Sequence, residues 1–262
     1  METVSTVKLG IAGCTGRMGQ ALLEAAVSAP GCRVVTGGVR AEEQAGRNMP
    51  PGLVLAHTAK ELMASSDVVI DFTAPEFTVE LALEAAGKAL VTGTTGFSTA
   101  QQRALEEAAH YAVIVQSANF SIGVNVLEAL VEQAARLLDD AYDIEVDEMH
   151  HRMKKDAPSG TALMLGRAAA QGREVDFAHA RLYRKEGLGE TRPRGAIGFS
   201  ARRGGEVVGV HTVTFAGPGE NLELTHRAFS RAIFAHGALR AARWAYGKKP
   251  GLYAMRDVLG EP

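Results

Sequence analysis

The feature that most constrains the fold is a regular alternation of short apolar segments with helix-forming segments over the first 120 residues. The apolar segments are short and continuous in the middle, as in Asp67–Phe72, which is typical of parallel strands buried on both faces. We predict strands at 7–12, 34–39, 53–55, 67–72, 89–92 and 113–115, and helices at 20–26, 60–65, 76–87 and 99–110. Such alternation predicts an α/β fold with a doubly wound parallel sheet.

A glycine-rich turn joins the first predicted strand to the first predicted helix. Its residues are Gly13, Cys14, Thr15, Gly16, Arg17, Met18 and Gly19. Glycines make such a turn tight and let its backbone approach a pyrophosphate, while the helix N-terminus faces the phosphates. The spacing is G-x-x-G-x-x-G, with Thr15 where the commoner fingerprint has its second glycine, and a turn without a ligand also fits. Together with the alternating strands, it predicts a Rossmann-type dinucleotide site.

Polar loops of small residues follow several predicted strands directly. They are Asp71–Pro75, Gly93–Gly96 and Ser117–Ser121. Singly, each is compatible with an ordinary turn or helix start. Ligands of doubly wound sheets bind beyond the carboxyl ends of the strands, so the loops together predict the rim of a cofactor cleft.

The end of the second predicted strand bears on the choice of cofactor. A site selective for NADH usually offers a carboxylate there to the ribose hydroxyls, but this chain has Val39 followed by Arg40. Arg40 can make charge-assisted bonds to a 2′-phosphate, although Glu42 or Glu43 could serve the ribose instead. We predict that NADPH is used at least as well as NADH.

The pattern changes after residue 121, which predicts a second, α+β domain. We predict helices at 124–138, 161–170 and 230–246, and strands at 142–148, 196–203, 206–216 and 221–226. Gly204-Gly205 predicts a hairpin between the second and third of these strands. Residues 172–195 show little periodicity and are expected to form a mobile or inter-subunit segment. The strands predict an open mixed sheet, whose free face and edges favour self-association.

Two adjacent histidines end the first strand of this second domain. Tyr142–Glu148 alternates acidic with apolar residues, so His150 and His151 are expected at the carboxyl end of a half-buried strand. They suit an acid/base site, but they are also compatible with satisfied structural histidines. Glu148, His150, His151 and Asp156 are possible metal ligands, yet adjacent residues of a strand point to opposite faces, so we predict no metal.

A helix start follows the histidines. Ser159 is a good N-cap, and the Ala-, Leu- and Met-rich segment after it predicts a helix that opens at Gly160-Thr161. Its backbone N–H groups and dipole favour an anion, Gly160 lets a ligand approach the backbone, and Lys154 adds positive charge. A carboxylate is the expected ligand, although Lys154 and Lys155 could also be a solvated charge pair.

Composition narrows the function classes. The chain has 262 residues and balances 28 basic against 30 acidic side chains, and its basic residues form no long run, so neither nucleic acid nor an anionic membrane is expected as a partner. Only Cys14 and Cys32 occur, which excludes a disulfide framework or a zinc pattern. The sequence also shows no signal peptide and no segment of membrane-spanning length, so a cytoplasmic location is expected.

The motifs also resemble a known family. The run His150–Ala162, HHRMKKDAPSGTA, is similar to the signature of the dihydrodipicolinate reductases, also called 4-hydroxy-tetrahydrodipicolinate reductases. Further matches in the same order are Gly13–Gly19, Asp71–Thr73, Gly93–Phe97, Ala118–Ser121 and Met255–Leu259. The resemblance covers essentially the whole chain.

The resemblance implies a role for each matching residue. The pyrophosphate would be held by Gly13, Cys14, Thr15, Gly16, Arg17 and Met18. The nicotinamide would be flanked by Gly93, Thr94, Thr95, Ser117, Ala118, Asn119 and Phe120. His150 and Lys154 would handle protons, with Lys154 the better general acid. Substrate carboxylates would be bound by His151, Ser159, Gly160 and Thr161.

The implied activity is hydride transfer from NADH or NADPH to 4-hydroxy-tetrahydrodipicolinate, a small dicarboxylate, in lysine and diaminopimelate biosynthesis. The resemblance also implies a homotetramer. It implies that residues 231–262 belong, with residues 1–121, to the dinucleotide-binding domain. Residues 122–230 would then form the substrate-binding and oligomerisation domain. The alternatives are another two-domain NAD(P)-dependent dehydrogenase, such as one acting on aspartate, and a regulator that senses a dinucleotide without chemistry.

Overall fold

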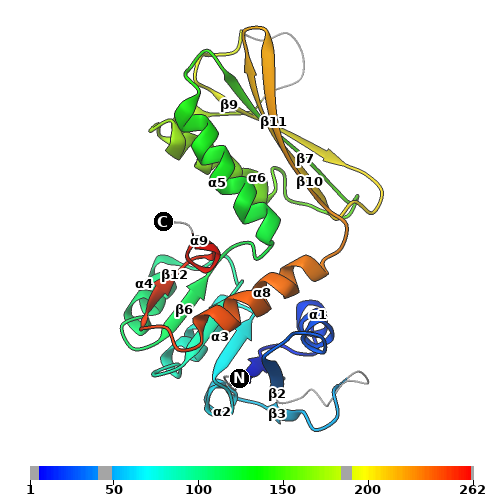
Figure 1. The fold of residues 1–262 in the computed structure, drawn as a ribbon, viewed down its shortest axis with the longest axis vertical. Helices are drawn as coiled ribbons and strands as arrows, with labels where there is room; N and C mark the ends of the chain where they lie inside the picture. Colours follow the sequence, from blue (N-terminus) through cyan, green and yellow to red (C-terminus); the bar gives the residue numbers. More distant parts are fainter. Residues whose placement is uncertain (1–5, 41–48, 184–190, 261–262) are drawn as a thin grey trace, which may run out of the picture. The chain divides into compact units, whose positions relative to one another are not determined.

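The chain divides into two compact units. A computed structural model describes residues 6–40, 49–183 and 191–260. Unit 1 comprises residues 1–122 and 232–262, and unit 2 comprises residues 123–231. Each unit is built on one sheet (Figure 1). Hydrophobic side chains pack on both faces of the sheet of unit 1 and on one face of the sheet of unit 2.

Unit 1 contains a seven-stranded parallel sheet in the order β12-β6-β5-β4-β1-β2-β3. Its strands are β1 (Val7–Ile11), β2 (Cys32–Gly38), β3 (Val54–Ala56), β4 (Val68–Asp71), β5 (Ala89–Thr92), β6 (Val113–Gln116) and β12 (Gly251–Tyr253). The strand order reverses between β1 and β4, which is where doubly wound sheets bind ligands. Strand β12 was not predicted as a strand, but it pairs with β6, so the C-terminal segment contributes the last strand of this sheet.

Helices cover both faces of this sheet. They are α1 (Arg17–Ala26), α2 (Ala59–Ala64), α3 (Pro75–Leu83), α4 (Thr99–Ala108), α8 (Ala232–Ala245) and α9 (Met255–Leu259). Successive residues of a strand belong to different cores, since Val68 and Ile70 pack with α1 and α8, whereas Val69 packs with α2 and α3. All four residues of β4 are therefore buried, and the doubly wound Rossmann-type fold is confirmed.

Unit 2 contains a five-stranded mixed sheet in the order β11-β10-β7-β9-β8. Its strands are β7 (Asp143–His150), β8 (Arg181–Tyr183), β9 (Ile197–Arg203), β10 (Gly209–Gly217) and β11 (Glu220–Ala228). The helices α5 (Ile122–Leu137) and α6 (Gly160–Gly172) pack with one face of the sheet, and α7 (Phe177–Ala180) lies beside α6. Ile144, Val146, Val213 and Phe215 form the sheet side of this core. The predicted open mixed sheet is confirmed.

The hairpin predicted at Gly204-Gly205 is wrong. Strands β9 and β10 do not pair with each other, because β7 lies between them and pairs with both. Gly204 N instead donates to His150 O (2.9 Å), and Gly205 O accepts from Arg152 N (3.2 Å), so this turn binds the end of β7. The hairpin of this sheet joins β10 to β11 at Pro218-Gly219, where φ of Gly219 is 84°, as a type II turn requires.

The segment 172–195 is more regular than expected, because it contains α7 and β8. Arg192, near its end, donates to the carbonyl oxygens of Ile144 (2.7 Å) and Ala196 (2.6 Å), which anchors the chain beside β7. Residues 184–190, which fall within the predicted irregular segment, lie outside the described residues.

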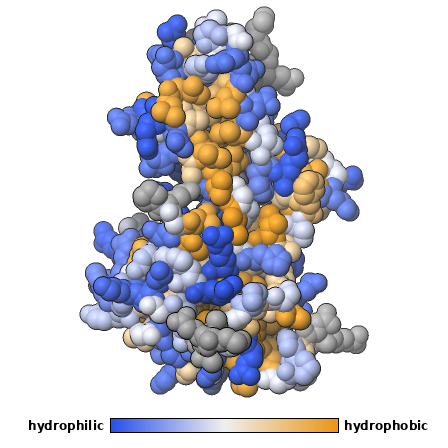
Figure 2. Space-filling view, in the orientation of Figure 1, coloured by the Kyte–Doolittle hydropathy of each residue, from blue (hydrophilic) through white to orange (hydrophobic). Residues whose placement is uncertain are grey.

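Helix α5 is apolar on two sides. It buries Leu127, Val131 and Ala135 in the core of unit 2. Val126 and Leu130 are nevertheless 42% and 45% exposed, and hydrophobic residues gather over this helix in the space-filling view (Figure 2).

Among the described residues, no helix is long and apolar enough to cross a membrane.

Candidate functional site

The glycine turn of unit 1 brings the start of α1 against the end of β1. Gly13 has φ of 61°, and its carbonyl accepts from Gly16 N at 2.9 Å. A Cβ on Gly19 would lie 2.3 Å from Gly13 O, so only glycine allows the helix to approach this closely. Within the described chain, no side chain caps the N-terminus of α1 at Gly16. This turn and helix start fit the pyrophosphate of a dinucleotide.

Three further cofactor candidates, two in this turn and one after β2, differ in exposure. Cys14 is fully buried, and its Sγ would lie 2.6 Å from a Cβ on Gly37, so its side chain packs under β2. Arg17 is exposed at the start of α1, and Arg40 is exposed just after β2, beyond the buried Val39. Glu42 and Glu43 lie outside the described residues.

A buried carboxylate, Asp71, organises the loops after β4 and β5. Its Oδ2 accepts from the hydroxyls of Thr78 (2.6 Å), Thr92 (2.9 Å) and Thr94 (2.9 Å). Its Oδ1 accepts from Thr73 N (3.1 Å) and from the Thr73 hydroxyl (2.5 Å). Thr94, a cofactor candidate, is thereby fixed at the rim. The sequence prediction placed Asp71 in the rim of the cofactor cleft but gave its carboxylate no role of its own, although an acid that ends a continuously apolar strand was the available signal.

The remaining rim residues divide between exposed and structural positions. Thr95 and Ala118 are exposed, whereas Phe120 is buried and packs edge to face against Phe72 at 5.5 Å between ring centroids. The side chain of Phe120 therefore belongs to the core of unit 1. A Cβ on Gly93 would meet the Phe72 ring at 2.0 Å, so glycine is required there too.

Ser117 and Asn119 shape the loop after β6. Ser117 Oγ donates to Asn119 O at 2.8 Å, and Asn119 Oδ1 accepts from Ser121 N at 2.8 Å. These bonds fix the backbone of the loop that is expected to flank the nicotinamide.

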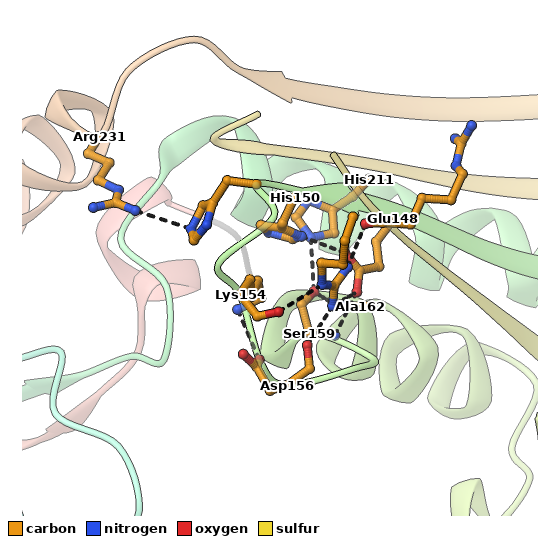
Figure 3. Close-up of polar contacts among 11 residues, drawn as sticks. Glu148, His150, Lys154, Asp156, Ser159, Ala162, His211 and Arg231 are labelled. Atoms are coloured by element: carbon orange, nitrogen blue, oxygen red, sulfur yellow. Dashed lines mark hydrogen bonds and ion pairs between the residues drawn. The ribbon is translucent and has the colours of Figure 1, made fainter. Parts of the chain in front are cut away.

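In unit 2, the two histidines lie where the sequence placed them. His150 is the last residue of β7 and shares the buried face with Ile144, Val146 and Glu148, whereas His151 follows the strand and is partly exposed. Figure 3 shows His150 beside Glu148, with Ser159 and His211 close by.

Glu148 is the centre of a buried polar network. Only 1% of the residue is exposed. Its Oε2 lies 2.5 Å from His150 Nδ1 and accepts from Arg203 Nη1 at 2.9 Å, and its Oε1 accepts from Arg203 Nη2 at 2.8 Å and from Ser159 N at 3.1 Å. Burial alone would raise the pKa of Glu148, but the bonds from Arg203 and His150 outweigh it and hold the pKa below its ordinary value. Glu148 is therefore ionised at neutral pH.

Burial lowers the pKa of His150, and the opposing attraction of Glu148 does not offset it. Lys154 and Arg203 add positive charge that lowers the pKa further. Since Arg203 shares the carboxylate with His150, the imidazole is not held as a cation and is neutral at pH 7.

His211 lies opposite Glu148 in the β7–β10 pairing and is 4% exposed. Its ring meets that of His150 edge to face at 5.0 Å, and its Nε2 lies 3.1 Å from Ser159 Oγ. Burial, followed by the charge of His150, lowers the pKa of His211 to about 4, so it is neutral at pH 7. Within the described residues its Nδ1 has no hydrogen-bond partner.

This contact assigns a direction to the Ser159 hydroxyl. A buried N–H without an acceptor is costlier than a buried lone pair without a donor, so we assign the His211 proton to Nε2, which then donates to Ser159 Oγ. Ser159 Oγ also accepts from Ala162 N at 3.2 Å. With both acceptor positions used, the hydroxyl hydrogen of Ser159 can be donated to a ligand.

Helix α6 begins at Gly160 and is capped by Ser159, as predicted. Gly160 is exposed, and a Cβ placed on it would meet no described atom within 4 Å, so the space beside its Cα is open. Its next residue, Thr161, is partly exposed. Because Ser159 N is bound to Glu148 and Ala162 N to Ser159 Oγ, the helix start offers a ligand the Gly160 N–H and the Ser159 hydroxyl, and the Thr161 side chain lies beside them.

Lys154 and His151 occupy the loop between β7 and α6. Lys154 Nζ lies 2.9 Å from Asp156 Oδ2, and hydrogen bonding to Lys154 is the main cause that lowers the pKa of Asp156. His151 Nε2 lies 3.3 Å from Arg231 Nη2 (Figure 3). His151 and Arg231 line a cavity of about 580 Å³ in unit 2. The other lining residues are Arg152, Met153, Gly205, Glu206 and Val208.

The structure therefore brings His150, Lys154, Ser159 and Gly160 together at one end of β7. It separates the two imidazoles, since His150 binds Glu148 and His151 binds Arg231. No group of three or more His, Cys, Asp or Glu side chains within the described ranges could hold a metal ion.

Sequence reasoning missed Arg203 and His211. The alternation of β10 could have located His211, which is in phase with Val213 and Phe215. Strand β9 gives no such signal for Arg203, because it buries Ile197, Gly198 and Phe199 in succession. The alternation alone does not show which strands are neighbours, and the contact of each residue with the site depends on that.

Comparisons with known proteins agree with these features. Residues 7–120 match the family model for the N-terminus of dihydrodipicolinate reductase, and residues 123–259 match that for its C-terminus. The 4-hydroxy-tetrahydrodipicolinate reductase of Beijerinckia indica is 48% identical over 267 residues, with 98% of each chain covered. That of Methylocella silvestris is 48% identical over 264 residues, with 97% of each covered.

Solved structures share the fold. A dipicolinate-bound dihydrodipicolinate reductase from Paenisporosarcina sp. TG-14 superposes with a TM-score of 0.78 at 22% identity, covering 96% of this chain and 99% of that one. A diaminopimelate dehydrogenase of C. glutamicum reaches only 0.55 at 13% identity, covering 96% and 93%. The two-domain layout is thus shared with another dehydrogenase, so the fold alone does not decide the family. The full-length relatives at 48% identity decide it. The chain belongs to the dihydrodipicolinate reductase family, whose members are NAD(P)H-dependent 4-hydroxy-tetrahydrodipicolinate reductases of lysine and diaminopimelate biosynthesis.

Proposed function

We propose that the carboxyl end of β7 and the start of α6 form the substrate and proton-transfer site of this reductase. The observation that carries the proposal is the Glu148 carboxylate, which binds both His150 Nδ1 and Ser159 N. The Glu148 carboxylate thereby fixes both the acid/base side chain of His150 and the anion-binding start of α6. The substrate is a small dicarboxylate.

One carboxylate of this substrate binds at the N-terminus of α6. Three features support this: the open space beside Gly160, the dipole of a helix that runs to Gly172, and the Ser159 hydroxyl whose hydrogen His211 leaves available. Thr161 adds a second hydroxyl at the same helix start. His151 binds a carboxylate from the cavity side, where Arg231 adds positive charge.

Unit 1 holds NAD(P)H. The pyrophosphate lies at Gly13, Cys14, Thr15, Gly16, Arg17 and Met18, and the nicotinamide is flanked by Gly93, Thr94, Thr95, Ser117, Ala118, Asn119 and Phe120. The buried Phe120 contributes through its backbone. When bound, the cofactor supplies the hydride. Arg40, exposed after β2, binds the 2′-phosphate of NADPH, so that NADPH serves at least as well as NADH.

Hydride addition leaves electron density on the substrate that a proton must neutralise. Lys154 is the general acid, because its side chain is 22% exposed and its ammonium keeps N–H groups beyond the one facing Asp156. His150 exchanges a proton through Nε2, since its Nδ1 is bound to Glu148.

We also propose a cytoplasmic homotetramer that assembles through the sheet face of unit 2 opposite α5 and α6. Thr212 and Thr214 of β10 lie on this face and are only partly exposed. Light scattering of the purified protein tests the assembly: a mass of four chains is expected, and a monomer at micromolar concentration would contradict it.

Replacing Lys154 by Ala tests the catalytic proposal. Turnover is expected to fall by about 10² to 10⁴, while the Kd for NADPH stays unchanged, since the lost group is a proton donor in unit 2. Lys155→Ala is the matched control, because its side chain is an exposed neighbour with the same charge. Near-normal turnover of Lys154→Ala would refute the assigned role.

A further inference from the structure

We propose that Glu148, clamped by Arg203, is a positioning residue that fixes the tautomer of His150 and holds the start of α6 in place beside it. The inference deepens the proposed function and rests on the proposed role of His150. Neither Glu148 nor Arg203 contacts the substrate in this scheme. Both act through the groups that do.

The tautomer follows from the donors around the carboxylate. An ionised carboxylate only accepts hydrogen bonds, and three of its contacts are N–H donors: Arg203 Nη1 (2.9 Å), Arg203 Nη2 (2.8 Å) and Ser159 N (3.1 Å). The fourth contact, His150 Nδ1 at 2.5 Å, must then also carry a hydrogen. His150 is therefore held as the Nδ1–H tautomer, and its Nε2 is the nitrogen that exchanges protons.

The surroundings of Nε2 agree with this direction. A Cβ on Gly209 would lie 3.1 Å from His150 Nε2, so the glycine at the start of β10 leaves room beside this nitrogen. Any larger residue at Gly209 would crowd the imidazole edge that the proposed chemistry uses.

The same pair also fixes the loop that carries Lys154. Arg203 donates to the carbonyl oxygens of Lys154 (3.3 Å) and Asp156 (2.5 Å) while it holds Glu148. Thus one ion pair binds the imidazole of His150, the backbone of Lys154 and the N-cap residue Ser159. A shift of the carboxylate would displace all of these groups together.

The competing explanation is that the pair serves stability alone. Replacing both partners of a purely structural buried ion pair by neutral groups can cost little, whereas removing one partner alone is destabilising. On that explanation Glu148→Gln would lower the free energy of unfolding, but the folded variant would keep normal turnover whatever tautomer His150 adopts. The positioning role predicts that the tautomer and turnover change together.

Glu148→Gln is the central variant, because it keeps the shape and removes the charge. Arg203 Nη2 and Ser159 N keep the amide oxygen at the Oε1 position, which turns the amide NH₂ toward His150 Nδ1 and costs the bond from Arg203 Nη1. The imidazole must then shift its proton to Nε2. In magic-angle spinning spectra of ¹⁵N-histidine-labelled protein, His150 is expected as Nδ1–H in the wild type and Nε2–H in the variant. His150→Gln identifies the resonances.

We expect kcat of Glu148→Gln to fall on the order of 10² to 10⁴-fold, as when a histidine is held in the wrong tautomer, with the Kd for NADPH unchanged. Glu148→Asp restores a carboxylate and should recover the Nδ1–H tautomer and part of kcat. Glu145→Gln is the matched control, since Glu145 lies on the opposite face of β7 and pairs with Arg192. It should leave tautomer and kcat unchanged.

A wild-type His150 that carries its hydrogen on Nε2 would overturn the inference, and this measurement needs no variant to fold. Normal kcat in folded Glu148→Gln would overturn it as well. Failure of the proposed function is distinguishable: if His150→Gln retains full turnover, His150 has no catalytic role, whatever its tautomer.

Discussion

Replacing Arg203 by Met removes the charge that compensates a buried carboxylate. The Glu148 side chain is 0% exposed and that of Arg203 is 20% exposed, so the pair is buried at the carboxylate end. Breaking a buried pair costs roughly 3 to 5 kcal/mol, and because His150 and Ser159 remain as donors, we expect about 3 kcal/mol. The methionine is similar in length and packs in the same space, so the loss reports on charge and hydrogen bonds.

The destabilisation should depend on pH. Without Arg203, burial dominates and raises the pKa of Glu148 in the folded variant above its unfolded value. The folded state then binds more protons than the unfolded state between these two pKa values, so its relative stability increases as the pH falls through them. The cost of Arg203→Met is therefore largest at pH 8 and smaller at pH 5.

Hydrogen exchange of peptides that span β7 and β10 measures this cost in unit 2 directly. Glu148→Gln added to Arg203→Met removes the uncompensated charge, so the double variant should be more stable than Arg203→Met alone. Unchanged protection of β7 in Arg203→Met, or a double variant that loses the sum of both single effects, would refute the reasoning.

Thr161→Val should raise the substrate KM about ten- to hundredfold through loss of a hydrogen bond to a charged group worth roughly 1.5 to 3 kcal/mol, and an unchanged KM in steady-state kinetics would place the carboxylate elsewhere. Arg40→Ala should weaken the Kd for NADPH about ten- to hundredfold and spare NADH; equal loss of both in fluorescence titrations would exclude Arg40 as the 2′-phosphate reader. The folded pKa of His211 is about 4, below its unfolded value. About 3 kcal/mol of the free energy of unfolding is therefore present above about pH 6.5 and is lost as the pH falls toward 4, because the unfolded state binds a proton in this range and the folded state does not. His211→Gln should flatten the stability profile in this range, and an acid limb that stays unchanged would show that other groups cause it.

Local patterns predicted much of the fold and part of the site. The continuous apolar runs of β4 and β5 identified buried strands, and Ser159 marked the start of α6, because burial and capping depend on neighbours in sequence. Arg203 is 55 residues from Glu148, and His211 is 52 residues from Ser159. Those contacts depend on strand order, which no local pattern encodes.

The misplaced hairpin has the same origin. Gly204-Gly205 and Pro218-Gly219 are both good turn sequences, and either could join paired strands. The position of β7 decides between them. Ile144, Val146 and Glu148 lie on its buried face, so β7 lies inside the sheet with a neighbouring strand at each edge. It pairs on both edges and so separates β9 from β10.

The most direct test of the account is an assay of the purified chain with substrate generated from pyruvate and aspartate semialdehyde, followed by the absorbance of the reduced nicotinamide. We expect oxidation of NADPH, and of NADH no faster at equal concentration, with nearly all turnover lost in Lys154→Ala. No oxidation above background with either cofactor would contradict it.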